Sequence, residues 1–259
     1  MMKILFTLCG RAGSKGFKNK NLKYFLKAPL AYYSVAAMDL YIRRHPEHEV
    51  YAVLSTDSPE LMDLIEKQTS IKFYVLNRAE DLCGDSVSKV AVIRDCLVKA
   101  KEYFSTDFDV VLDLDITSPL RTVQDIANAL EKKSQRKDTD VVYSVTTSRR
   151  SPYFNMVKEE NGYFKRAVQA QYTARQQAPT LYDMNASIYA YAPQALMDKP
   201  IPVFFLDGAD AIFMKDTAVL DIDGEEDFEL IQVIGKYFYE KYPDFQEVYI
   251  RAVELAQGK

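Results

Sequence analysis

The sequence predicts an α/β fold in which a mostly parallel β-sheet carries helices on both faces. Apolar runs of strand length alternate with amphipathic helical patterns through residues 1–147. The runs are almost continuously apolar, as in strands buried on both faces, and the helical patterns between them imply right-handed crossovers. The chain has 259 residues, 48% of them hydrophobic, which is enough for a substantial core. We therefore expect a single domain over residues 1–259.

Each element in this alternation has a local signal. Strands are predicted at 3–9, 50–57, 71–76, 109–115 and 140–147, and helices at 29–44, 58–69, 86–104 and 122–136. A first helical turn tolerates proline, so Pro29 is placed there. Ser58 is a typical N-cap, and Thr122 with Asp125 predicts a capping box.

The pattern changes after Thr147. Asn161-Gly162 lies between two strand-like runs, which predicts a β-hairpin. We expect this hairpin to belong to an excursion at about 148–182. Short β runs up to 218–223 and two helical patterns then complete the chain.

Composition excludes several classes of function. The net charge is −4 and the acids are spread along the chain, so we expect no nucleic-acid partner and no membrane partner. His45 and His48 are the only histidines and share one polar turn, which argues against a catalytic triad or a histidine base. Cys9, Cys83 and Cys96 show no C-x-x-C spacing, which favours a reducing compartment, and we expect a cytoplasmic protein.

The segment after the first strand, "GRAGSKGFKNKNLK", predicts a phosphate-binding loop. It combines three glycines with several cations, namely Gly10, Gly13, Gly16, Arg11, Lys15 and Lys20. Glycines allow backbone N–H groups to approach an anion, and the cations supply charge. The spacing fits neither G-x-G-x-x-G nor a P-loop, and a solvated basic loop is the structural alternative.

This segment resembles the opening signature of the acylneuraminate (CMP-sialic acid) cytidylyltransferases. Further matches follow in the order of that family: "STD" (55–57), "NRAEDLCGDS" (77–86), "TSPLRT" (117–122), "ARQQAPTLYDMNASIYAY" (174–191) and "DIDGEEDFEL" (221–230). The resemblance covers residues 3–232. It implies a Rossmann-like nucleotidyltransferase fold and a homodimer built through the protruding segment. It also implies transfer of CMP from CTP to a nine-carbon 2-keto sugar acid, with release of pyrophosphate and a requirement for Mg²⁺.

The resemblance also implies roles for individual residues. The triphosphate is expected at Arg11, Ser14, Lys15, Lys20 and Asn21, and the nucleoside near Arg78 and Ser88. The sugar acid is expected at Asp115, Arg175, Gln176 and Asn185. The catalytic residues are expected to be Arg11, Lys20 and Asp221, and the metal ligands Asp221 and Asp223.

The late D-x-D sequence supports the metal assignment independently. Asp221 and Asp223 are two residues apart in an expected strand, so both carboxylates point to one face while Ile222 enters the core. Mg²⁺ is commonly bound by one or two carboxylates together with substrate phosphates. The structural alternative is a pair of solvated acids at a strand end.

The chain departs from the family pattern at several positions. Asp115 replaces a glutamine that in relatives faces the acylamino arm of the sugar, and Lys89 replaces a second serine. A carboxylate accepts hydrogen bonds but donates none, so we expect a sugar that differs from N-acetylneuraminate in its amino substituents. Alternatively, Asp115 reaches the metal. Asn155 and Asp183 stand where relatives often carry cations, which leaves the partner of the sugar carboxylate open.

Three other functions compete with this prediction. The nearest is another sugar nucleotidyltransferase that uses 3-deoxy-manno-octulosonate, a different nonulosonic acid or a different nucleotide. A nicotinamide-dependent oxidoreductase is disfavoured by the missing G-x-G-x-x-G motif. A non-catalytic nucleotide-sugar binding protein would not need Asp221 and Asp223.

Overall fold

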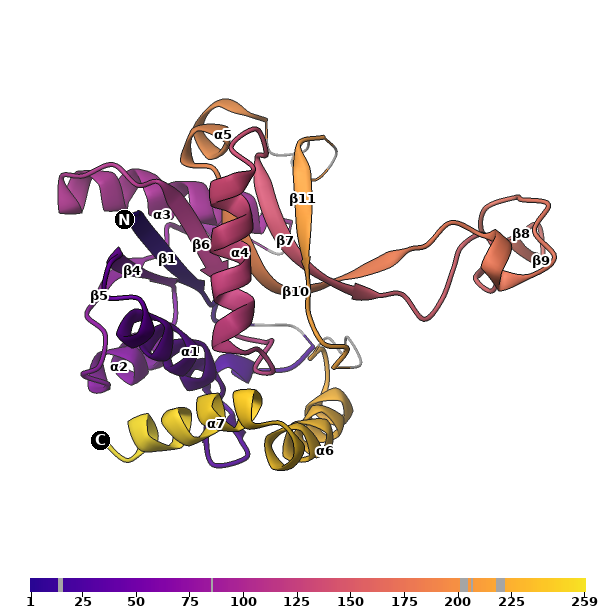
Figure 1. Ribbon diagram of the computed structural model, residues 1–259. Coiled ribbons are helices and arrows are strands. Elements are labelled where there is room, and N and C mark those ends of the chain that lie inside the picture. Colours follow the sequence, from indigo (N-terminus) through magenta and orange to yellow (C-terminus); the bar gives the residue numbers. More distant parts are fainter. Residues whose placement is uncertain (14–15, 85, 201–204, 206, 218–221) are drawn as a thin grey trace.

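A seven-stranded sheet forms the centre of the protein. The computed structural model describes residues 1–13, 16–84, 86–200, 205, 207–217 and 222–259. Within these residues the strand order is β11-β7-β10-β6-β1-β4-β5. The strands are β1 (Lys3–Cys9), β4 (Glu49–Thr56), β5 (Phe73–Asn77), β6 (Val110–Leu114), β7 (Val141–Thr147), β10 (Tyr182–Tyr191) and β11 (Ala209–Phe213). Only β10 runs antiparallel to its neighbours, so the predicted mostly parallel sheet is confirmed (Figure 1).

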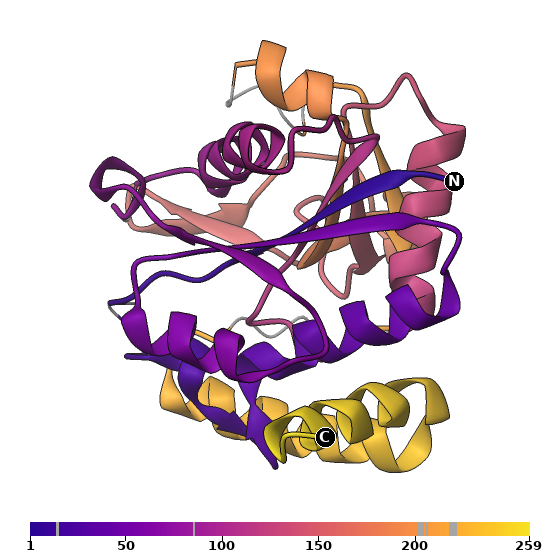
Figure 2. The ribbon, with the colours of Figure 1, turned by 90° about the vertical axis from the view of Figure 1, so that its left-hand side faces the viewer.

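Helices cover both faces of this sheet, as predicted. They are α1 (Leu30–Arg44), α2 (Pro59–Lys67), α3 (Lys89–Phe104), α4 (Val123–Gln135), α5 (Pro193–Asp198), α6 (Glu225–Lys241) and α7 (Pro243–Ala256). Successive side chains of β1 alternate between two cores because a strand points them to opposite faces. Ile4, Phe6 and Leu8 belong to the core that includes side chains of α1, α4 and α7, whereas Leu5 packs with side chains of α3 and α5. Figure 2 shows the sheet between these helical layers, with α7 below α1.

The expected helix starts are largely confirmed. The Ser58 side chain accepts a hydrogen bond from the Leu61 N–H, and Thr122 with Asp125 forms the capping box. Pro29 is the exception, because it is the N-cap residue and α1 begins one residue later. Before it, a 3₁₀ turn η1 (Lys20–Leu22) and the two-residue strands β2 (Tyr24–Phe25) and β3 (Ala28–Pro29) were not predicted, because they are too short to show periodicity.

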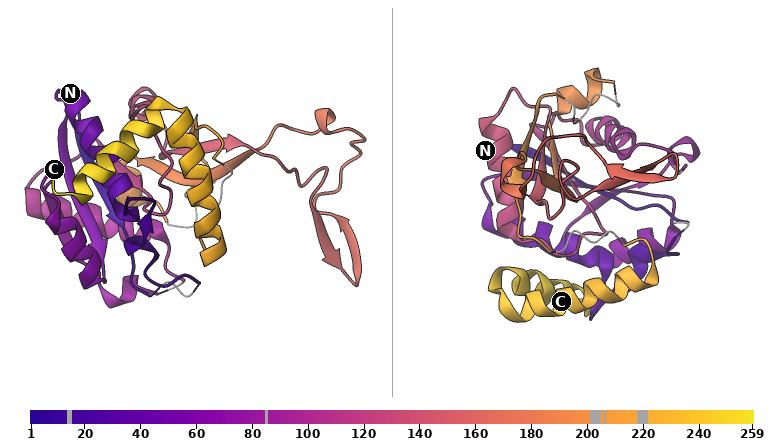
Figure 3. Two further views of the ribbon diagram at one scale, coloured as in Figure 1. Left: turned by 90° about the horizontal axis from the view of Figure 1, so that it is seen from below. Right: turned by 90° about the vertical axis from the view of Figure 1, so that its right-hand side faces the viewer.

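The predicted hairpin protrudes from the body of the protein. It is formed by β8 (Val157–Glu160) and β9 (Tyr163–Arg166), which pair antiparallel. Asn161 and Gly162 have φ values of 56° and 79°, the left-handed conformation that this tight turn requires. The segment leaves the sheet after β7 and returns in β10, and it extends well beyond the helices (Figures 1 and 3).

The region after β10 differs from the expected series of short β runs. It contains α5 before the single described strand β11, and Pro193 occupies the first turn of α5. Residues 218–221 of the expected run at 218–223 lie outside the described residues, and Ile222 is buried as expected. None of the helices in the described part of the chain combines the length and the hydrophobicity that a membrane span requires.

Candidate active site

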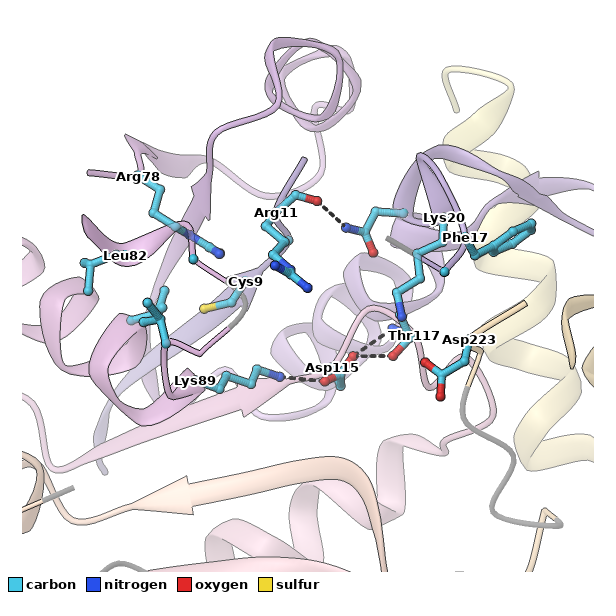
Figure 4. A pocket seen from close by; sticks show the side chains of 16 residues that line it. Cys9, Arg11, Phe17, Lys20, Arg78, Leu82, Lys89, Asp115, Thr117 and Asp223 are labelled. Carbon is cyan, nitrogen blue, oxygen red and sulfur yellow. Dashed lines mark hydrogen bonds and ion pairs between the residues drawn. The ribbon is translucent and has the colours of Figure 1, made fainter. Parts of the chain in front are cut away.

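A pocket of about 550 Å³ opens at the carboxyl ends of the parallel strands, where open α/β sheets bind their ligands. Segments that follow β1, β4, β5 and β6 converge on this edge. The pocket is lined by Cys9, Gly10, Arg11, Gly16, Phe17, Lys20, Asn21, Arg78, Leu82, Gly84, Val87, Lys89, Val92, Asp115, Thr117 and Asp223 (Figure 4).

The loop after β1 is held by the end of β4 and by the residue that follows it. The Gly10 N–H donates to the Ser55 carbonyl at 3.1 Å, and the Ala12 N–H donates to Asp57 Oδ1 at 2.6 Å. The "STD" sequence at 55–57 therefore supports the glycine-rich loop. Asn21 Nδ2 donates to the Arg11 carbonyl at 3.4 Å across the base of the loop, and both residues line the pocket (Figure 4).

The loop also contacts the late acidic segment. Lys20 Nζ donates to the Ile222 carbonyl at 2.9 Å. Gly16 lies so close to the Asp223 carbonyl oxygen that a Cβ on Gly16 would overlap it. Arg11, Lys20 and Asp223 therefore line one pocket, as the sequence prediction requires, although they are far apart in the chain.

The start of α6 fixes the backbone next to Asp223. The N–H groups of Asp223 and Gly224 both donate to Asp227 Oδ2, at 3.1 and 2.9 Å. The Asp223 side chain faces the pocket near Lys20 (Figure 4).

The floor of the pocket holds a cation between two acids. Lys89 Nζ lies 2.7 Å from Asp113 Oδ2 and 2.7 Å from Asp115 Oδ2. Asp113 also accepts a hydrogen bond from Thr7 Oγ1 at 2.8 Å. Asp115 Oδ1 accepts from both the N–H and the hydroxyl of Thr117, at 2.9 and 2.7 Å. Two positions at which the sequence departs from the family pattern, 89 and 115, are therefore in direct contact.

These contacts keep Asp115 and Lys89 ionised at neutral pH. Burial opposes charge on Asp115, but the Lys89 ammonium and the hydrogen bonds from Thr117 outweigh it and lower the pKa of Asp115 to about 2. Burial would likewise lower the pKa of Lys89, yet Asp113 and Asp115 together raise it well above its usual value. Lys89 is consequently a permanent cation and not a general base at neutral pH.

A buried arginine supports Asp115 from below. Arg121 is 1% exposed, and it donates from Nε to Ser187 Oγ at 3.1 Å and from Nη1 to Ser34 Oγ at 2.7 Å. Its Nη2 donates to the backbone carbonyl of Asp115. Burial lowers its pKa to about 10 despite the nearby acids. Arg121 thereby joins the segment after β6 to β10 and α1.

The two residues expected near the nucleoside have different positions. Arg78 lines the pocket and is held by Ser55, with Nε 3.2 Å from Oγ and Nη2 2.7 Å from the carbonyl oxygen. Ser88 is the N-cap of α3, where its hydroxyl accepts from the Val90 N–H, and its neighbours Val87 and Lys89 line the pocket.

The residues expected at the sugar acid are not all in this pocket. Asp115 lines it. Arg175 and Gln176 belong to a 3₁₀ turn, η3 (Arg175–Gln177), on the protruding segment, where Gln176 is exposed. Asn185 is on β10, but its side chain contacts Ser144 and Met214. Three other expected residues, Ser14, Lys15 and Asp221, lie outside the described residues.

The sequence interpretation missed the role of Lys89 and Thr117 in the pocket. A signal was present, because Asp113 and Asp115 end a buried strand, and buried carboxylates require a nearby cation or several hydrogen bonds. The first turn of the preceding helix, which begins at Lys89, could have supplied it.

The carboxylate oxygens of the pocket suit a hard divalent cation that is bound together with a nucleotide. Asp223 offers a carboxylate beside the cationic loop, and Mg²⁺ in nucleotide sites needs only one or two carboxylates in addition to phosphate oxygens and waters. Asp115 is the other pocket acid among the described residues, and Lys89 and Thr117 already bind it.

Comparison with known proteins agrees with this geometry. The family model described as cytidylyltransferase matches residues 8–205. A CMP-N,N'-diacetyllegionaminic acid synthase of Campylobacter jejuni is 34% identical over 90% of this chain and 95% of its own length. The post-translational flagellin modification protein B of Campylobacter coli is 33% identical over 91% of this chain and 96% of its own length.

The fold is shared with a solved nucleotidyltransferase. The structure of a CMP:2-keto-3-deoxy-manno-octonic acid synthetase complexed with CTP superimposes with a TM-score of 0.62 over 91% of this chain and 99% of that one, at 15% identity. This likeness confirms the expected Rossmann-like nucleotidyltransferase architecture. The chain belongs to the cytidylyltransferase family and is, as its sequence predicts, a CTP-dependent nucleotidyltransferase of the acylneuraminate type.

Proposed function

We propose that the protein transfers CMP from CTP to the anomeric hydroxyl of a sialic-acid-like nine-carbon 2-keto sugar acid and releases pyrophosphate. The observation that supports this most strongly is the convergence of Arg11, Lys20 and Asp223 in one pocket at the carboxyl edge of the sheet. Family membership supports the same reaction. We further propose a sugar of the N,N'-diacetyllegionaminic type in preference to N-acetylneuraminate, because the relative of that name is 34% identical over nearly its whole length.

The residues of the pocket suit nucleotidyl transfer. This reaction needs in-line placement of the substrates and neutralisation of charge on phosphate oxygens more than it needs covalent participation by the protein. Lys20 supplies positive charge beside Asp223, and Arg11 supplies it from a position between Lys20 and Arg78 (Figure 4). Arg78 and Leu82 line the opposite end, where we place the nucleoside.

We propose that Mg²⁺ is the cofactor and that Asp223 and Asp221 bind it. When bound, the ion would neutralise charge on the phosphates and lower the pKa of the attacking hydroxyl. The carboxylate of Asp223 beside Lys20 supports this proposal.

We also propose a homodimer formed through the protruding hairpin. Val157, Tyr163 and Phe164 are 62%, 73% and 73% exposed there, and apolar side chains gathered on one hairpin indicate a protein interface. Arg175 and Gln176 on the same segment would then reach the pocket of the second copy. Size-exclusion chromatography with light scattering should show a dimer that Phe164→Glu dissociates, and a wild-type monomer would contradict the proposal.

We also propose that the protein is cytoplasmic. The cysteines that the structure describes, Cys9, Cys83 and Cys96, are free, which suits a reducing compartment. Fractionation of the native cells should therefore recover the protein with the cytosol.

The reaction is tested by mass spectrometry of the product formed from CTP, Mg²⁺ and a mixture of sugar acids. The mixture contains N,N'-diacetyllegionaminic acid, N-acetylneuraminic acid and 3-deoxy-manno-octulosonic acid. We expect the mass of CMP-N,N'-diacetyllegionaminic acid, and pyrophosphate release that requires both CTP and the acid. A product from the octulosonic acid alone, or from a different nucleotide, would contradict the proposal.

A matched pair of variants ties the activity to the pocket. Lys20→Met should lower kcat/KM by about 10²-fold, the usual effect of removing one group that stabilises developing charge. Lys18→Met is the control, because Lys18 is exposed on the same loop and does not line the pocket. Equal activity of the two variants would remove Lys20 from the mechanism.

A further inference from the structure

The charges of the pocket floor balance one another, whereas the loop above it carries the cations Arg11 and Lys20. Lys89 and the buried Arg121 carry two positive charges and Asp113 and Asp115 carry two negative charges, so the four groups together have no net charge. Asp113 is fully buried, whereas the side chains of Lys89 and Asp115 are 33% and 21% exposed toward the pocket. The ring of Tyr189 lies 5.9 Å from the Lys89 ammonium and holds it from another side.

This balance determines which part of a substrate can bind at the floor. A triphosphate or the carboxylate of a sugar acid is attracted to the excess positive charge of Arg11 and Lys20. The floor offers an anion no excess positive charge, and it exposes the Asp115 carboxylate to the pocket. The floor therefore suits a neutral polar part of the second substrate.

The hydrogen-bonding capacity of the floor is equally specific. An ammonium has three N–H donors. Lys89 uses one of them in a hydrogen bond to Asp115, and its contact with Asp113 Oδ2 is an ion pair without a hydrogen bond, so Lys89 retains at least one donor for a ligand. Each carboxylate oxygen can accept two hydrogen bonds. Oδ1 of Asp115 already accepts two from Thr117, whereas Oδ2 accepts one from Lys89 and can accept another. The floor thus presents one donor and one acceptor side by side.

We propose that Lys89 and Asp115 act together as a specificity-determining pair that binds a neutral substituent of the sugar acid, one that carries an O–H or N–H donor beside an oxygen acceptor. A hydroxyl or an acylamino group has this chemistry. The pair offers the donor and the acceptor that the amide of one glutamine side chain would offer, divided between two residues. The donor that Asp115 alone lacks is therefore supplied by Lys89. This inference rests on the proposed function.

The test separates the two substrates kinetically. For Lys89→Met and Asp115→Asn we expect kcat/KM for N,N'-diacetyllegionaminic acid to fall by about 10- to 100-fold, the range for a hydrogen bond to a charged group, with KM for CTP unchanged within about twofold. Lys99→Met is the control, because Lys99 lies on the same helix and pairs with Asp95 outside the pocket. A change in KM for CTP alone would assign Lys89 to the nucleotide and overturn the proposal.

A second variant covers the case in which Lys89→Met does not fold, since it leaves the fully buried Asp113 without its cation. Lys89→Met combined with Asp113→Asn removes one cation and one acid, so the net charge of the floor is preserved. We expect this double variant to fold and to lose about 10- to 100-fold in kcat/KM for the sugar acid, with KM for CTP unchanged within about twofold. A folded double variant with wild-type kcat/KM would overturn the proposal.

Substrate analogues identify the group that is bound. In one analogue an acylamino group is replaced by hydroxyl, and in the other a hydroxyl is replaced by hydrogen. The wild type should discriminate against one of them, and Lys89→Met should lose that discrimination. If the wild type transfers CMP but Lys89→Met discriminates equally, this inference alone fails. If the wild type releases no pyrophosphate with any sugar acid, the proposed function fails as well.

Discussion

The contact between Gly16 and the Asp223 carbonyl makes Gly16→Ala an informative variant. The added methyl group would overlap the carbonyl oxygen, and no flexible side-chain end can yield there because the obstacle is backbone. The two segments would have to separate by about 1 Å to reach an ordinary contact of 3.4 Å. This separation would move the cationic loop away from the metal-binding segment.

The expected cost follows from that displacement. Overpacking of this kind destabilises a protein by roughly 1–3 kcal/mol. A misplacement of about 1 Å in an active site can cost about 10²-fold in rate, which corresponds to about 2.7 kcal/mol of transition-state stabilisation. We therefore expect kcat/KM to fall by about 10²-fold and the concentration of Mg²⁺ needed for half-maximal activity to rise.

Pyrophosphate release at varied Mg²⁺ and urea denaturation measure the two effects. Gly224→Ala is the control, because its added Cβ would lie 3.7 Å from Asp227 Oδ2, an ordinary contact one residue beyond Asp223. If Gly16→Ala kept both wild-type kcat/KM and wild-type stability, the close packing of loop and acid would not exist in solution.

Three further predictions concern the interior and the pocket floor. Arg121→Lys should lower the free energy of unfolding, measured in urea, by about 2–4 kcal/mol. The reason is that an ammonium cannot reproduce the forked geometry in which the guanidinium donates hydrogen bonds to Ser187 and its other partners, and wild-type stability would contradict this. Gly235→Ala places a Cβ 2.6 Å from the ring of Phe25 and should cost roughly 1–3 kcal/mol while kcat/KM stays within about twofold, and an equal loss of activity would refute it. Asp115 has a folded pKa of about 2, below its usual 3.8, so its contribution of about 2 kcal/mol should be present above pH 4 and lost as the pH falls toward 2. Urea titrations of the wild type and Asp115→Asn across that range should converge, and parallel curves would refute the assignment.

The sheet, the hairpin and one side of the pocket could be predicted from the sequence. Parallel strands bring their carboxyl ends to one edge, so motifs after the strands could be expected to meet there. Arg11, Lys20, Arg78 and Asp223 do line a common pocket. The hairpin turn was predictable because Asn-Gly favours the left-handed conformation at both positions.

Contacts that depend on the packing of distant elements were not predictable. The ion pair of Lys89 with Asp115 joins the first turn of a helix to the end of the next strand. The hydrophobic periodicity of the sequence does not show which residue of a helix meets which residue of a strand. The direction in which the Asn185 side chain points could not be predicted for another reason. The pairing register of β10 with β7 shifts between Met184 and Tyr189. A shift of this kind changes the face to which a side chain points.

The most direct test of the account is a crystal structure of the protein with CTP and Mg²⁺. We predict that the triphosphate lies between Arg11 and Lys20, with the metal bound to Asp223 and the phosphates. A nucleotide bound at another surface, or a metal that does not contact Asp223, would contradict the central claim.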